Sequence, residues 1–224
     1  MNKYKTLMLV MFFLSLFALS KTNALVKDYT LLGKTIYLDA GHGGKDSGAI
    51  STTIIEKEIN LILTQKLAKE LTSKGAYVLL TRDGDYDLSK STKNRKRNDL
   101  YNRVKLINEE DCDLYISIHL NSSTSTKWSG LQIFYSNVNK ENKVIATTLN
   151  TNLKKEFTNI REIKEENNYY MYPKIKPKGV LIEAGFISNP NDNYLLRQED
   201  YQNKLVKNIA NGIEFYFNNQ KNIV

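Results

Sequence analysis

Short apolar runs alternate with longer amphipathic stretches along most of the chain, the pattern of strands alternating with helices. Within one such stretch, apolar residues recur at spacings of three and four, at Ile59, Ile62, Leu63, Leu67 and Leu71. This spacing predicts a helix from about Glu56 to Ser73, ended by Lys74-Gly75. The same reasoning predicts strands over 35–39, 76–80, 114–118, 131–135 and 179–182, and further helices over about 98–110, 141–157 and 199–217.

Two segments lack a regular period, a polar loop over 82–97 and a stretch over 158–178. No internal repeat or linker divides the chain. Repeated strand–helix units of this kind predict an α/β fold, with a single domain and a mostly parallel, twisted sheet flanked by helices.

The first 24 residues have the pattern of a secretory signal peptide. Lys3 and Lys5 precede an apolar run over 7–19, and Thr22-Asn23-Ala24 places small residues at a cleavage site. The run is shorter than the roughly 20 apolar residues that a transmembrane helix needs. We therefore expect residues 1–24 to be removed on export, leaving 25–224 without an integral membrane segment. An uncleaved N-terminal tether is the alternative.

The formal net charge of the chain is +8. Without residues 1–24, which hold three lysines and no acid, 29 basic and 24 acidic residues leave a charge of +5. This excess is either ordinary surface charge or an attraction to a polyanionic matrix such as a bacterial wall. Nucleic acid is not an expected partner, because the chain has no recognisable nucleic-acid motif. Cys112 is the only cysteine, which excludes an intramolecular disulfide, and we expect it to be buried.

The chain has only two histidines, and each follows a predicted strand. His42 comes after the strand over 35–39, and His119 comes directly after the strand over 114–118. Strand ends of α/β sheets gather side chains around ligands, and imidazole is the commonest side-chain metal ligand. Glu56 begins the helix after the first strand, and Glu183 ends a strand that could lie beside that of His119.

Two imidazoles and one carboxylate form a known catalytic zinc set, and a further carboxylate outside that set can transfer protons. Each residue alone has an ordinary alternative. A histidine at a strand end is often a hydrogen-bonded turn residue, and the glycines around His42 could form only a tight turn or a phosphate loop. Glu56 could be a first-turn helix acid, and Glu183 could be a salt-bridge partner.

Four motifs in order, spread over about residues 34–217, resemble the zinc-dependent N-acetylmuramoyl-L-alanine amidases of the amidase-3 type. They are DAGHGGKDSGA at 39–49, EK at 56–57, SIHLN at 117–121 and EAGFISN at 183–189. The resemblance implies that His42, Glu56 and His119 hold zinc and that Glu183 is catalytic. It implies cleavage of the amide between the lactyl group of N-acetylmuramic acid and the L-alanine of the peptidoglycan stem peptide. Asn121 is a further candidate for substrate contact, and Arg103 is expected to be structural.

Within this family the chain looks most like the spore-cortex type, which clears stem peptides so that muramic-δ-lactam can form. That type implies a place in the cell wall or the space between the forespore membranes. It also implies a muramic deacetylase in the same pathway and, in some relatives, an accessory lipoprotein. The alternatives are a vegetative autolysin of the same type, a zinc-dependent stem-peptide carboxypeptidase or sugar deacetylase, and a silent wall-binding module. Glu183 argues against the last, since binding alone does not need it.

Overall fold

The computed structural model describes residues 3, 4, 6–8, 10–12 and 29–220. The expected signal peptide therefore lies mostly outside the described residues, and its cleavage remains a prediction. In the described part of the chain, no helix has the length and apolar character needed to cross a membrane.

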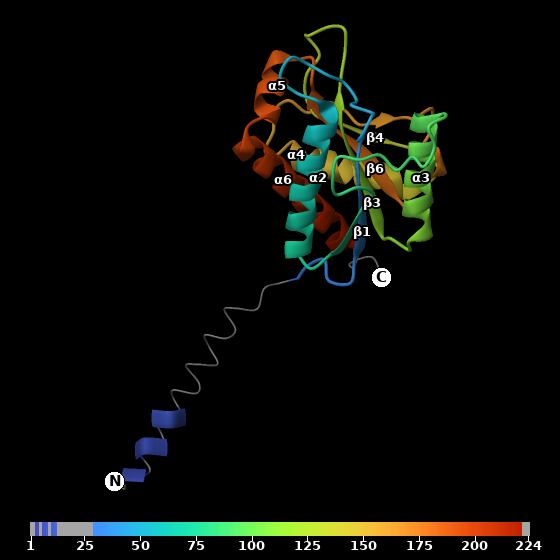
Figure 1. Cartoon of the computed structure of the whole chain (residues 1–224). Helices are drawn as coiled ribbons and strands as arrows, with labels where there is room; N and C mark the ends of the chain where they lie inside the picture. The colour runs from blue at the N-terminus through green and yellow to red at the C-terminus, as the bar shows by residue number, and fades with distance from the viewer. Residues whose placement is uncertain (1–2, 5, 9, 13–28, 221–224) are drawn as a thin grey trace.

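Six strands form one sheet in the order β2-β1-β3-β6-β4-β5 (Figure 1). All neighbouring strands run parallel except β4 and β6, which run antiparallel. The strands are β1 Thr35–Ala40, β2 Tyr77–Leu80, β3 Leu114–Asn121, β4 Gln132–Tyr135, β5 Lys164–Glu165 and β6 Gly179–Phe186. The helices are α2 Glu56–Ser73, α3 Arg95–Glu109, α4 Lys140–Leu153, α5 Pro190–Leu196 and α6 Glu199–Gln220, with a short 3-10 turn, η2, at Tyr172–Lys174. The expected α/β fold, a mostly parallel sheet flanked by helices, is confirmed.

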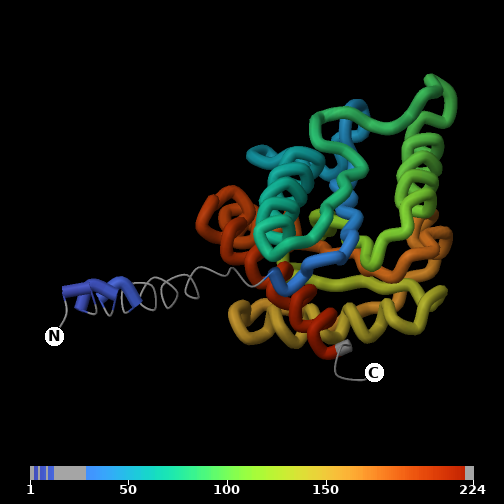
Figure 2. Tube along the Cα trace, turned by 90° about the horizontal axis from the view of Figure 1, so that it is seen from below, coloured from blue at the N-terminus to red at the C-terminus, as the bar shows by residue number. Residues whose placement is uncertain are grey.

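The two faces of the sheet bury different side chains, because successive residues of a strand point to opposite faces. In β6, Val180 and Ile182 belong to the larger core, which α2, α4 and α6 cover, whereas Leu181 belongs to a smaller core beneath α3. Figures 1 and 2 show α3 apart from the other long helices, across the sheet. The smaller core also contains Cys112, which is buried as expected, and burial raises the pKa of its thiol to about 11.

Two strands extend further than the sequence predicts. β3 continues to Asn121 and β6 to Phe186. His119 therefore lies within its strand instead of directly after it, and Glu183 lies within its strand instead of at its end. The apolar runs stop at polar residues, but the backbone ladder continues, and His119 stands in register with Glu183. The expectation that these two strands are neighbours is confirmed.

Helix boundaries also differ in places. α3 begins at Arg95, inside the predicted loop, and α4 ends at Leu153, four residues early. The short α5 is missing from the prediction because seven residues cannot show a helical period. Its start is nevertheless marked in the sequence: Asn189 accepts hydrogen bonds from the backbone of Asn191 and Asp192, and Pro190 occupies the first turn.

Candidate active site

Three side chains from separate segments meet above the carboxyl ends of β1 and β3. His42 follows two residues after the end of β1, Glu56 is the first residue of α2, and His119 lies on β3. One ligand atom from each lies within 4.8 Å of the other two. His42 Nε2 is 3.2 Å and His119 Nδ1 is 3.0 Å from Glu56 Oε1. The two rings meet edge to face, with centroids 4.8 Å apart.

This spacing fits a small divalent cation. Bonds of about 2.0–2.1 Å in a tetrahedral site separate neighbouring donor atoms by roughly 3.4 Å. The distances from Glu56 Oε1 to the two imidazole nitrogens are slightly shorter, as they are when hydrogen bonds join the same atoms. Two neutral imidazoles and a carboxylate are moreover a donor set that zinc accepts.

Glu56 is fixed by backbone donors as well as by the histidines. Its Oε2 accepts a hydrogen bond from Ala49 N at 2.8 Å, and its Oε1 accepts one from Leu120 N at 3.1 Å. Burial alone would raise the pKa of Glu56, but the hydrogen bonds to His119 and His42 outweigh burial and hold that pKa well below its usual range. The carboxylate is therefore ionised and held in one orientation.

His42 is oriented by Asp46, a residue that sequence reasoning missed. Asp46 Oδ2 lies 2.9 Å from His42 Nδ1, which leaves Nε2 facing Glu56. Burial alone would lower the pKa of His42, but the hydrogen bonds to Asp46 and Glu56 raise it to about 9. A carboxylate on the far nitrogen of a metal-binding imidazole fixes its tautomer and ring orientation. The available signal was the acid four residues after the histidine.

The glycines near His42 make room for the site. A Cβ on Gly41 would lie 2.3 Å from the ring of His119, and one on Gly48 would lie 2.5 Å from Glu56 Oε2. Gly48 also has a φ of +67°, which side chains rarely adopt. These positions therefore require glycine for close packing around the three side chains.

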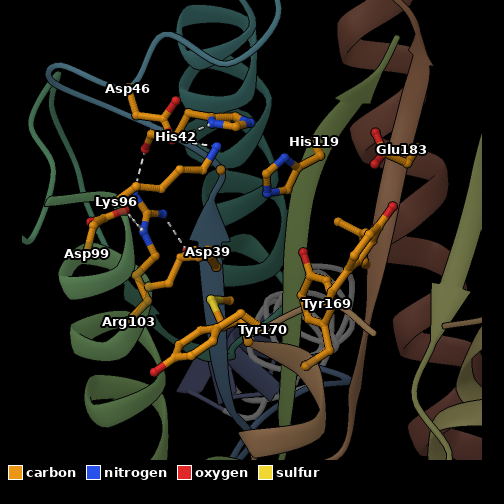
Figure 3. Close-up of a pocket in the computed structure, with 15 residues that line it drawn as sticks. Asp39, His42, Asp46, Lys96, Asp99, Arg103, His119, Tyr169, Tyr170 and Glu183 are labelled. Carbon is orange, nitrogen blue, oxygen red and sulfur yellow. Dashed lines mark hydrogen bonds and ion pairs between the residues drawn. The ribbon is translucent and has the colours of Figure 1, made fainter. Parts of the chain in front are cut away.

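Glu183 lies on the strand next to His119, in register with it, and lines the same cavity as both histidines (Figure 3). It is 8% exposed, and its Oε2 has no hydrogen-bond partner in the described residues. Burial, with repulsion from Glu56, raises the pKa of Glu183 to about 8. Burying a carboxyl group without a partner destabilises the folded state. The position of Glu183 therefore indicates a chemical role in the site and not a structural ion pair.

A cavity of about 280 Å³ opens beside these residues. His42, His119 and Glu183 line one part of it, and Lys96, Leu100 and the segment 169–172 line another. The ion-paired side chains of Asp39, Asp46, Asp99 and Arg103 also contribute to the lining, with Gly41 and Leu181. Asn121, the candidate for substrate contact, is not among the lining residues. Its Oδ1 accepts a hydrogen bond from Ser122 N at 2.9 Å.

Two buried arginines hold the backbone that carries His42. Arg103 donates to Asp39 at 2.7 Å, to Asp99 at 2.9 Å, and to the carbonyls of Ala40 and His42 at 2.6 and 2.5 Å. Arg82, which sequence reasoning missed, donates to the carbonyls of Ala40 and Gly41, both at 2.9 Å. Each arginine is 1% exposed. Arg103 thus contacts the backbone of the site, in keeping with its expected structural role.

Comparison with known proteins identifies the family. Residues 36–215 match the sequence model of the N-acetylmuramoyl-L-alanine amidases, Amidase_3. The chain therefore belongs to this family of enzymes, which act on peptidoglycan, and the resemblance seen in the motifs is confirmed. It is 42% identical over 192 residues to the germination-specific N-acetylmuramoyl-L-alanine amidase of Bacillus subtilis, covering 84% of this chain and 81% of that protein.

Solved structures agree with this assignment. The CwlD amidase from Clostridioides difficile, in complex with the GerS lipoprotein, superposes with a TM-score of 0.78 at 36% identity, over 83% of this chain and 99% of that one. The catalytic domain of the amidase CwlV from Bacillus (Paenibacillus) polymyxa superposes with a TM-score of 0.73 at 31% identity, over 83% and 98%.

The Arg103 network generates a prediction about stability. Arg103→Met should lower the free energy of unfolding by about 3–5 kcal/mol, because it leaves Asp39 and Asp99 buried without their cation. Denaturant unfolding of the metal-free protein measures the change. Lys105→Met, on the exposed side of the same helix, is the control and should stay within about 0.5 kcal/mol of wild type. A loss below about 1 kcal/mol for Arg103→Met would contradict the role given to this network.

Proposed function

We propose that the chain is a zinc-dependent N-acetylmuramoyl-L-alanine amidase with His42, Glu56 and His119 as the zinc ligands and Glu183 as the catalytic base. The observation that carries the proposal is the convergence of three ligand atoms within 4.8 Å, together with a buried carboxyl group on the neighbouring strand whose Oε2 has no hydrogen-bond partner in the described residues. The chemistry of the donor set and the family both support zinc.

The residues divide the work of hydrolysis. When bound, zinc supplies a Lewis acid that polarises the amide carbonyl and activates water. A cation beside Glu183 favours its ionised form, which accepts a proton from the attacking water. As the carbon–oxygen bond forms and the carbon–nitrogen bond breaks, Glu183 passes that proton to the leaving nitrogen. The products are the lactyl carboxylate of N-acetylmuramic acid and a peptide with a free L-alanine amine.

The place of action is the spore cortex, where removal of stem peptides precedes muramic-δ-lactam formation. The similarity to a germination-specific amidase of Bacillus subtilis supports this role. Residues 1–24 serve as the export signal and 25–224 as the catalytic domain, which acts in the wall or the forespore intermembrane space. A muramic deacetylase completes the lactam, and a lipoprotein is a suitable accessory partner because a similar amidase was solved with one.

Removing a ligand tests the metal centre. His42→Ala and His119→Ala should each lose most of the bound zinc, because the site then has only two protein ligands. Elemental analysis of folded, zinc-equilibrated protein gives the zinc content per chain, with about one zinc expected for wild type. If both variants retained stoichiometric zinc, the ligand assignment would be wrong.

Glu183→Gln separates catalysis from metal binding. The variant should keep its zinc and its fold but lose about 10²–10⁴ in rate, the usual contribution of a general base. The assay digests defined peptidoglycan and identifies the products by mass spectrometry, since only an amidase releases an intact stem peptide with a free L-alanine amine. Near-normal turnover would make Glu183 a structural acid, and loss of zinc would make it a ligand.

The cortex role has its own test. Deletion of the gene should give spores whose cortex lacks muramic-δ-lactam, measured by muropeptide analysis, and the wild-type gene should restore it. The gene carrying Glu183→Gln is the matched control and should not restore the lactam. Spores with normal lactam would favour a vegetative autolysin and leave the amidase chemistry intact.

A further inference from the structure

The basic run Lys93-Asn94-Arg95-Lys96-Arg97 has no place in the mechanism above. It opens α3, whose first turn holds three cations and no acid. Positive charge at the start of a helix opposes the helix dipole, so helix stability does not account for these residues. Arg95 is engaged with Asp87, at 2.7 Å. Lys96 and Arg97 need another explanation.

Lys96 lines the same cavity as His42, His119 and Glu183. Its side chain runs along the cavity wall toward His42 (Figure 3), and its Nζ lies 3.6 Å from Asp46 Oδ2. That pair is long, and the lysine side chain is 68% exposed, so the contact binds it weakly. Among the described residues, Arg103 is the other lysine or arginine in the lining, and it is buried against two carboxylates. Lys96 is therefore the lining cation that a ligand can reach.

Further cations lie on the Tyr170 side of the cavity, whereas the acids Asp46 and Asp99 lie on the other side of Lys96. Tyr170, another lining residue, has Lys174 Nζ 3.9 Å and the Arg97 guanidinium 5.7 Å from its ring centroid. On the far side of Tyr170 lies an open hollow of about 420 Å³, to which Lys93 and Arg97 contribute but no acid does. Cations thus follow the surface outward from the cavity.

We infer that Lys96 binds a carboxylate of the stem peptide, so that the cavity selects an acidic peptide beyond the L-alanine. This inference rests on the proposed amidase function. The cations should face the part of the substrate that carries negative charge. The lactyl carboxyl forms the amide that is cleaved and is therefore uncharged, so the free carboxylates of the substrate lie in the peptide. Arg97 and Lys93 extend the positive field along it.

Two synthetic N-acetylmuramoyl peptides provide the test, identical except that the free carboxyl of the second residue is a carboxamide in one of them. Wild-type enzyme should prefer the carboxylate, and the ratio of the two kcat/KM values is the readout. Lys96→Met should lower that ratio by up to about fivefold, the upper end of the range for an exposed ion pair, while Lys96→Arg should restore most of it. Added salt should lower the wild-type ratio as well.

Lys105→Met is the matched control, because Lys105 lies on the same helix and has a similarly loose ion pair, 3.5 Å from Glu109. It should keep the wild-type ratio. A Lys96→Met enzyme with an unchanged ratio and reduced zinc content would show that Lys96 acts through Asp46, and would overturn the inference. Equal cleavage of both peptides by wild type would overturn it too. If neither peptide released a free L-alanine amine, the proposed function itself would fail.

Discussion

The geometry of the site depends on the hydrogen bonds and ion pairs that the guanidinium of Arg103 makes. At the end of β1 the chain turns away from the sheet, and His42 takes a φ of +61° that non-glycine residues rarely adopt. Buried carbonyls at such a turn need hydrogen-bond partners, which the sheet no longer supplies. Arg103 reaches Ala40 and His42 from α3, and Arg82 reaches Ala40 and Gly41 from the end of β2. His42 is held in position because two arginines from distant parts of the sequence stabilise the backbone around it.

Asp39 makes this arrangement electrostatically possible. It is fully buried, and although burial alone would raise its pKa, Arg103 and the hydroxyl groups of Ser117 and Thr81 hold that pKa below its usual value. The carboxylate compensates Arg103 at the floor of the cavity. Above it, Glu56 has a lowered pKa and Glu183 a raised one. Carboxyl groups whose environments push their pKa values apart serve different tasks, and here one suits holding a cation and the other suits exchanging a proton.

Most helices and strands of the fold can be predicted, because they depend on the pattern of apolar and polar residues within each segment. The helix α2 is predictable at both ends, since its apolar residues keep a period from Ile59 to Leu71 and Lys74-Gly75 ends the helix. His42 and His119 stand out in the sequence because histidine is so rare in this chain. The ends of β3 and β6 escape prediction because polar site residues interrupt the apolar pattern while backbone pairing continues. The roles of Arg82 and Asp46 could not be predicted, because they depend on contacts that form only when the turns fold. The periodicity of the sequence does not indicate such contacts.

The separation of the clustered side chains along the chain has a consequence for the order of assembly. Glu56 and His119 are 63 residues apart and meet only when α2 packs over the paired strands β1 and β3. No short segment of the unfolded chain contains both histidines, which are 77 residues apart in sequence. Contacts between segments so far apart in sequence slow folding, because closing a long loop costs conformational entropy. Any cation that uses all three side chains therefore binds after these long-range contacts have formed, and not to short segments of the unfolded chain.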